Sequence, residues 1–138
     1  MSSERIARRY YQLFNERRLD EAEQLVDPQA VFHYLPTRQR LVGRAGYRAL
    51  TGAWLQAFTD AQLEVQYVHV LDTSVVRIEF VGGGTHTGDL VLGDALTIPA
   101  TGRTAALPFH DRLDIRGGLV VTSELDFDID EMKRRLLG

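Results

Sequence analysis

Apolar residues recur every three or four positions in several separated stretches of the chain, which is the spacing of helices with one buried face. In the first stretch these residues are Ile6, Tyr10, Leu13 and Phe14. Ser2 or Ser3 stands before them as a candidate N-cap, so the pattern predicts a helix that begins there. The same argument predicts a short helix over Leu19–Leu25, a longer one over Gly43–Phe58 and a terminal one over Ile129–Leu137.

Between these helical stretches, apolar and polar residues alternate, which is typical of strands. An early strand is predicted over Ala30–Leu35, and Pro36 ends it. The later runs are Leu63–Leu71, Ser74–Val81, Thr85–Leu92, Thr104–Ile115 and Leu119–Asp128. Helices first and strands afterwards predict an α+β fold, with three N-terminal helices on one face of a curved, mainly antiparallel sheet. A sheet bent strongly enough under those helices can enclose a pocket.

Composition and charge narrow the class of protein. The 138 residues suit one domain over 1–138 with one core. The net charge is −3, so the composition gives no sign of a basic surface that would bind nucleic acid. Cysteine is absent, which excludes disulfides and thiolate chemistry. No apolar run approaches the ~20 residues of a membrane span, and the first residues lack the apolar core of a signal peptide. We therefore expect a cytoplasmic protein with no membrane or nucleic-acid partner. No two of the four histidines have His-x-x-x-His spacing, so no metal site is expected.

Two short segments carry an order of residues that composition alone would not produce. Residues 84–90 read Gly-Thr-His-Thr-Gly-Asp-Leu, and residues 98–103 read Ile-Pro-Ala-Thr-Gly-Arg. Together they resemble a signature of the SnoaL-like polyketide cyclase family, in which Gly-Thr-His-Thr-Gly precedes a Pro-x-Thr-Gly-Lys/Arg turn. The resemblance extends over nearly the whole chain. It implies the nuclear-transport-factor-like cone, with a small-molecule pocket inside.

The last two predicted strands form a hairpin whose register decides which side chains meet. A three-residue loop with Gly118 in the left-handed conformation pairs Ile115 with Leu119. This register makes one face almost wholly apolar and places His110 opposite Glu124 on the other face. A two-residue loop would mix the two sets, so the hydrophobic pattern favours the longer loop.

A carboxylate beside a histidine can act as a general base and acid. The family resemblance implies the same chemistry, because SnoaL-like cyclases use a histidine and a carboxylate for an intramolecular aldol condensation without a cofactor. We therefore expect Glu124, His110 and Asp126 to be the catalytic residues, acting on a small, largely apolar carbonyl compound. The chain departs from the family here, since its cyclases carry Asp as the base and many relatives have Trp at the Glu124 place.

The same residues allow other interpretations. A strand face with histidine, arginine and carboxylates is often only solvated, or is a dimer surface. The opposite face offers Asp111 across from Ser123 among apolar neighbours, either as a satisfied structural group or as the true pocket acid. With Arg112 and Asp126, Asp111 would also suit an epoxide hydrolase or isomerase of the same fold. A ligand-binding dimer without a reactive pair is the non-enzymatic alternative.

Three further side chains complete the expected substrate-binding set, together with Arg112 and Asp111. Strand alternation groups His33 with apolar neighbours, which indicates the interior, although a core histidine is the more frequent outcome. Trp54 belongs to the apolar stripe of the third helix, as core or as pocket wall. His86 is part of the signature and has a structural alternative, holding the neighbouring turn. The long terminal strands offer more surface than three short helices can cover, so we also expect a homodimer.

Overall fold

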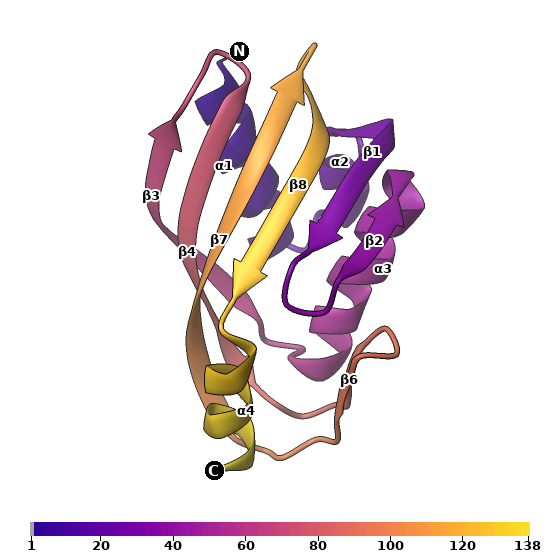
Figure 1. Cartoon of the computed structure of the whole chain (residues 1–138), viewed down its shortest axis with the longest axis vertical. Helices are drawn as coiled ribbons and strands as arrows, with labels where there is room; N and C mark the ends of the chain where they lie inside the picture. The colour runs from indigo at the N-terminus through magenta and orange to yellow at the C-terminus, as the bar shows by residue number, and fades with distance from the viewer. Residues whose placement is uncertain (1) are drawn as a thin grey trace.

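A layer of helices covers one face of a long twisted sheet in the computed structural model, which describes residues 2–138 (Figure 1). The helices are α1 (Ser3–Asn15), α2 (Leu19–Glu23), α3 (Gly43–Ala57) and α4 (Ile129–Leu137). The strands are β1 (Val26–Tyr34), β2 (Gln39–Val42), β3 (Gln62–Val70), β4 (Val75–Thr85), β5 (Leu90–Leu92), β6 (Leu96–Ile98), β7 (Thr104–Arg116) and β8 (Leu119–Phe127). None of the described helices has both the length and the apolar character needed to cross a membrane.

Six strands form the main sheet in the order β2-β1-β8-β7-β4-β3, and β5 and β6 form a separate two-stranded ribbon. Only the contact between β1 and β8 is parallel, and the other neighbours in the sheet are antiparallel. The predicted α+β fold with a mainly antiparallel sheet is therefore confirmed.

Helices α1, α2 and α3 lie behind the sheet in Figure 1, and α4 lies at the end away from the N-terminus. We call the sheet face under α1 and α3 the inner face and the opposite one the outer face. Along β4, Val76, Ile78 and Phe80 are buried on the inner face, whereas Arg77 and Glu79 belong to the outer face.

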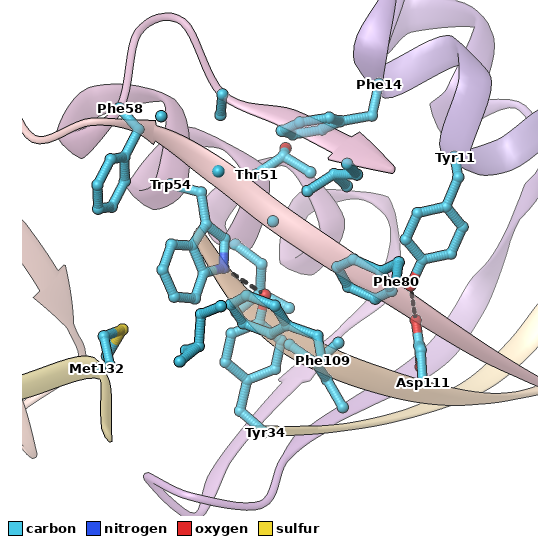
Figure 2. Close-up of a pocket in the computed structure, with 18 of the residues that line it drawn as sticks. Tyr11, Phe14, Tyr34, Thr51, Trp54, Phe58, Phe80, Phe109, Asp111 and Met132 are labelled. Carbon is cyan, nitrogen blue, oxygen red and sulfur yellow. Dashed lines mark hydrogen bonds between the residues drawn. The ribbon is translucent and has the colours of Figure 1, made fainter. Parts of the chain in front are cut away.

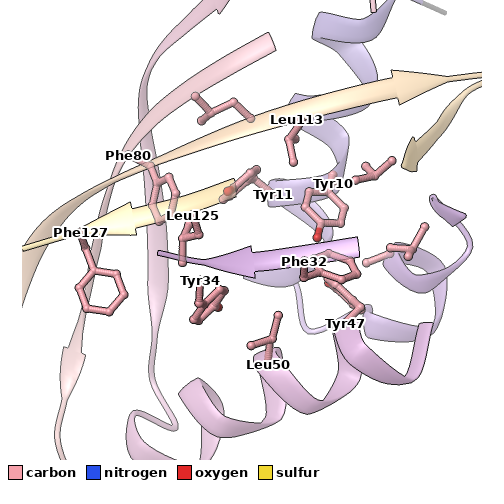
Figure 3. Packing of buried hydrophobic residues seen from close by; sticks show 14 of the residues in the cluster. Tyr10, Tyr11, Phe32, Tyr34, Tyr47, Leu50, Phe80, Leu113, Leu125 and Phe127 are labelled. Carbon is pink, nitrogen blue, oxygen red and sulfur yellow. The ribbon is translucent and has the colours of Figure 1, made fainter. Parts of the chain in front are cut away.

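Helix α1 begins where the sequence predicts, because the side chain of Ser2 accepts a hydrogen bond from the Arg5 N–H at 3.2 Å. The helix buries its apolar stripe against the sheet. Figure 3 shows the tyrosines of α1 meeting Tyr47 and Leu50 of α3 and the inner face of the sheet in one core.

The Gly-Thr-His-Thr-Gly segment fastens α3 to the sheet. The N–H groups of Thr87 and Gly88 both donate to the carbonyl of Ala57 at the end of α3, at 3.0 and 3.1 Å. The backbone of His86 exchanges two hydrogen bonds of 2.8 Å with Arg103 and Gly102, so the two halves of the signature pair with each other. The signature is thus a structural clamp, consistent with the turn-holding alternative for His86.

Some strand boundaries differ from the prediction. Residues 85–92 are not one strand: Thr85 ends β4, the chain turns, and only Leu90–Leu92 is extended. Its partner β6 and the edge strand β2 were not predicted, because three or four residues are too few to show an alternating pattern. Strand β1 also begins at Val26, earlier than the apolar run indicates.

Candidate functional site

A cavity of about 130 Å³ lies between α1, α3, α4 and the inner face of the sheet. Its wall is largely aromatic. The aromatic residues that line it are Tyr10, Tyr11, Phe14, Phe32, Tyr34, Tyr47, Trp54, Phe58, Phe80 and Phe109. Leucines, alanines and the glycines at 82–84 complete much of the wall, so an apolar ligand is the natural occupant.

Asp111 is the one carboxylate among the described residues that line the cavity. Only 3% of this residue is exposed. Tyr11 Oη donates to Oδ2 at 2.5 Å, and Ser123 Oγ donates to Oδ1 at 2.7 Å. Figure 2 shows the Tyr11 contact at one side of the pocket. Burial raises the pKa of Asp111, and the two hydrogen bonds oppose that rise without cancelling it. The carboxyl group therefore takes up a proton more readily than an exposed aspartate.

A second polar pair stands in the same cavity. Trp54 Nε1 donates to the hydroxyl oxygen of Tyr34 at 2.8 Å (Figure 2). Burial raises the pKa of Tyr34, so its phenol stays neutral. The negative charge of Asp111, which lines the same cavity, contributes to that rise. Because the indole uses one lone pair of the phenol, the Tyr34 proton can point to a ligand oxygen.

A family model described as a SnoaL-like domain matches residues 7–123. The chain belongs to the SnoaL-like family. No curated protein matches the chain significantly.

Solved structures share the fold of this SnoaL-like chain at low identity. A candidate SnoaL-like polyketide cyclase from Jannaschia is 14% identical, with a TM-score of 0.84 over 97% of this chain and 90% of that one. An NTF2-like protein of unknown function from Burkholderia pseudomallei is 18% identical, with a TM-score of 0.78 over the whole of both chains. A candidate ketosteroid isomerase from Kribbella flavida is 21% identical, with a TM-score of 0.67 over 91% of this chain and 77% of that one. At these identities the likeness establishes the fold.

The β7–β8 hairpin of this SnoaL-like domain does not have the predicted pairing. Gly117 and Gly118 both have positive φ, 57° and 77°, and form a two-residue turn between Arg116 and Leu119. A shift of register between Asp114 and the next residue then restores the separation of polar and apolar faces. The predicted faces are therefore right, but the pairing is displaced by two residues.

As a result, His110 faces Asp126, and Glu124 faces Arg112. The predicted His110–Glu124 pair was wrong. His110 Nε2 lies 3.7 Å from Asp126 Oδ2, with the two side chains 41% and 40% exposed, in an open depression of the outer face. None of these four residues lines the internal cavity among the described side chains.

The remaining predicted site residues also divide into those that line the cavity and those that do not. Trp54 lines the cavity of the SnoaL-like domain, as expected. His33 does not, because its neighbours Phe32 and Tyr34 face inward and His33 pairs on the outer side with Arg40 and Glu124. Val31 and Leu35, which share a strand face with His33, are half-buried and exposed on that outer side, so local alternation indicated the wrong face. Tyr11, Tyr34 and Tyr47 also line the cavity and are not among the site residues predicted from the sequence.

His86 stands behind the cavity wall. Its ring stacks on Phe58 at a centroid distance of 5.1 Å, and Nδ1 lies 2.9 Å from Thr101 Oγ1. It is fully buried and is not among the residues that line the cavity. Within residues 2–138, no three histidine, aspartate or glutamate side chains come together as metal ligands would.

Proposed function

We propose that this SnoaL-like domain binds a small, largely apolar carbonyl compound and removes a proton from the carbon beside its carbonyl group. Asp111 is the proposed base. The observation that carries the proposal is a buried carboxylate with a raised pKa in the wall of an otherwise aromatic cavity. A general base works best when its pKa lies near the operating pH, and burial moves Asp111 in that direction.

The chemistry needs no cofactor. Asp111 takes the proton, and the C–H electron pair moves to give an enolate. The neutral phenol of Tyr34, held by Trp54, donates a hydrogen bond to the developing enolate oxygen. The enolate carbon then attacks a second carbonyl carbon of the same molecule, or it is reprotonated elsewhere. The first outcome is an aldol cyclisation, in which Asp111 returns its proton to the new alkoxide, and the second is an isomerisation.

The names given to the structural neighbours agree with this chemical range. Polyketide cyclisation and ketosteroid isomerisation both begin with removal of a proton beside a carbonyl group. The epoxide hydrolase alternative has less support, because Asp111 lies on the inner face while Arg112 and Asp126 lie on the outer face. The three side chains cannot act on one bound molecule.

Hydrogen–deuterium exchange tests the proposal before a natural substrate is known. Small cyclic ketones are incubated with the protein in D2O, and loss of the α-hydrogen signals is followed by NMR. We expect Asp111→Asn to lower the enzyme-dependent exchange rate by about 10² to 10⁴. Ketone binding should persist and can be followed by the fluorescence of Trp54, the only tryptophan in the chain.

Two outer-face variants serve as controls. Glu124→Gln and His110→Ala remove the acid–base groups first expected from the sequence, and neither side chain lines the cavity. They should exchange ketone protons at the wild-type rate. If Asp111→Asn also kept that rate, Asp111 would be a satisfied structural group and another residue would be the base. If the wild type itself bound ketones without exchanging their protons, the domain would be a ligand-binding protein.

A further inference from the structure

The cavity follows the inner face of strand β7 over much of its length. Alternate residues of this strand line it: Ala105, Leu107, Phe109 and Asp111. Residues of a strand advance by about 3.4 Å each, so Asp111 and Ala105 stand about 20 Å apart along the strand. Figure 2 shows the same extension, with Asp111 at one side of the pocket, Met132 at the other, and Trp54 and Phe109 between them. The cavity is therefore elongated, and so is a ligand that fills it.

The two ends of the cavity differ in polarity and in exposure. The end at Asp111 is closed, because this residue is 3% exposed and Tyr11 donates to it. At the other end α4 contributes Met132, Leu136 and Arg135, and the Arg135 side chain is 44% exposed. Between these ends, the lining residues of β4 and β7 are apolar or glycine. The closed end thus suits a carbonyl group, and the wall that leads to α4 suits an apolar chain.

Gly82 lies in that wall, at a position where the strand pattern calls for a side chain. Ile78 and Phe80 precede it on the inner face of β4. A Cβ atom at Gly82 would lie 2.9 Å from Cε1 of the Phe109 ring and 3.5 Å from Cδ2 of Leu63, and both of these side chains line the cavity. A glycine within a strand often marks the close approach of another group, which here is the Phe109 ring. A side chain at this position would push the ring off the strand and into the cavity.

Ala105 keeps the far end of the cavity open in a similar way. It stands opposite Gly84 in the sheet and is half-buried. Arg135 of α4 donates to the carbonyl of Ala106, so α4 lies against this end of β7. The Ala106 side chain is exposed and does not line the cavity. A larger side chain at 105 would therefore shorten the cavity next to α4, whereas one at 106 would extend into solvent.

We propose that the ligand is an elongated carbonyl compound whose carbonyl end lies at Asp111 and whose apolar chain runs past Phe109 and Gly82 to α4. This inference rests on the proposed function for the use of the carbonyl group at Asp111. Gly82 and Ala105 are then specificity-determining residues, because the absence of larger side chains there admits the chain.

NMR spectroscopy with one long ketone tests the orientation. The probe is methyl octyl ketone. We expect the methyl group at the end of its chain to show a nuclear Overhauser effect to the Met132 methyl group. The methyl group beside the carbonyl should show one to the ring of Tyr11, which donates to Asp111. The reverse pattern, or binding without either contact, would overturn the inference.

NMR titrations with a series of ketones test the length of the cavity. The probes are methyl ethyl, methyl butyl, methyl hexyl and methyl octyl ketone. In the wild type, we expect affinity to rise along the series by up to about fourfold for each methylene group that is buried. Equal affinities for the four ketones would contradict an elongated cavity, and so would a failure of all four to bind.

Two variants shorten or narrow the cavity. Ala105→Leu should lower the affinity for methyl octyl ketone by about tenfold or more and leave that for methyl ethyl ketone within about twofold. Gly82→Ala should act in the same direction, through displacement of the Phe109 ring. Unchanged binding of the short ketone shows that each variant is folded.

Each variant has a matched control outside the cavity. Ala106→Leu adds the same side chain one residue further along β7, on the exposed side. Gly52→Ala adds a methyl group where nothing lies within 4 Å of the Cβ position. Both controls should keep the wild-type affinities for all four ketones. If Ala105→Leu and Gly82→Ala also kept them, the chain would not run along this wall, and the inference would be wrong.

These binding measurements do not depend on turnover, so the two proposals fail separately. If methyl octyl ketone binds in the expected orientation but its α-hydrogens never exchange, the ligand class stands and the proposed reaction is wrong. If ketones exchange through Asp111 without any gain in affinity from a longer chain, the reaction stands and the ligand class is wrong.

Discussion

The hydroxyl group of Tyr11 donates a 2.5 Å hydrogen bond to Asp111, across 100 positions of the sequence. The contact ties the first helix to the inner face of β7, and both side chains are buried. It stabilises the ionised carboxylate, whereas burial favours the protonated form. The balance of these two effects sets the proton affinity of the proposed base.

Removal of the Tyr11 hydroxyl group should shift that balance. In Tyr11→Phe the carboxylate loses a hydrogen bond that lowers its pKa, while burial still raises it. The pKa of Asp111 therefore rises further. We expect the pH–rate profile of ketone proton exchange to move its acidic limb to higher pH. Tyr10→Phe is the control, because Tyr10 contacts Tyr11 edge-on but has no hydrogen bond to Asp111. Identical profiles for the wild type and Tyr11→Phe would mean that Asp111 is not the titrating group.

Titration of Asp111 should also make the stability of the folded protein depend on pH. Its pKa is raised in the folded state, so the folded protein holds this proton more tightly than the unfolded chain. The stabilising contribution is complete below the ordinary carboxyl value of 3.8 and is lost as pH rises through the raised value. Asp111→Asn has no such proton. As pH rises over this range, the wild type should therefore lose free energy of unfolding relative to the variant. Urea unfolding in acidic and neutral buffers measures the difference. A constant difference at all pH values would contradict the expectation.

Much of the fold follows from local patterns. The predicted terminal helix matches α4 residue for residue, and Ser2 caps α1 as expected. The two faces of the β7–β8 hairpin were also assigned correctly, with Asp111 on the apolar side. These features depend on spacing and capping, which neighbouring residues determine.

The pairing across the hairpin does not follow from such patterns. Both glycines of the turn take positive φ, and the irregularity after Asp114 compensates for the shorter loop. No single residue type marks where a strand will bulge, so two registers two residues apart satisfy the same pattern. Which face lines the cavity was also undecided, because it depends on where α1 and α3 lie. That is why Glu124 and His110 were preferred over Asp111.

Two glycine substitutions should have opposite effects on stability, one inside the clamp formed by the Gly-Thr-His-Thr-Gly segment and one outside it. A Cβ atom on Gly88 would lie 2.0 Å from the carbonyl oxygen of Gln56, which is backbone and cannot move freely. Gly88→Ala should destabilise the fold by about 1–3 kcal/mol. Gly52 lies exposed within α3 with nothing within 4 Å of its Cβ position. Gly52→Ala should therefore stabilise the protein by about 0.5–1 kcal/mol. Thermal unfolding of both variants tests the pair, and a tolerated Gly88→Ala would show that the clamp is loose.

We expect the outer face to pair with a second copy of the chain. Arg112 lies there between Arg77 and Glu124 on the neighbouring strands, so the face carries both signs of charge and can complement itself. Light scattering at micromolar concentration should give a mass twice 15.6 kDa. Arg112→Glu reverses the charge between Arg77 and Glu124 and makes this face more acidic on both copies, so it should shift the protein towards the monomer. Arg5→Glu, on the exposed side of α1, should leave the mass unchanged. A monomeric wild type would contradict the expectation.

The signature histidine should occupy a single tautomer. Nδ1 of His86 accepts a hydrogen bond from the Thr101 N–H at 3.3 Å and lies 2.9 Å from Thr101 Oγ1, which itself accepts from the Arg103 N–H. A ring nitrogen that accepts an N–H cannot carry its own proton, so the neutral ring is protonated at Nε2. We expect nitrogen-15 NMR to show the Nε2–H form.

The hydroxyl group of Thr101 then links the two halves of the signature. Thr101→Val removes both of its hydrogen bonds within the clamp and should cost about 1–2 kcal/mol of stability. Thr97→Val, at an exposed position of β6, is the matched control and should be nearly neutral. An Nδ1–H tautomer, or equal stabilities of the two variants, would show that His86 does not hold the turn through Thr101.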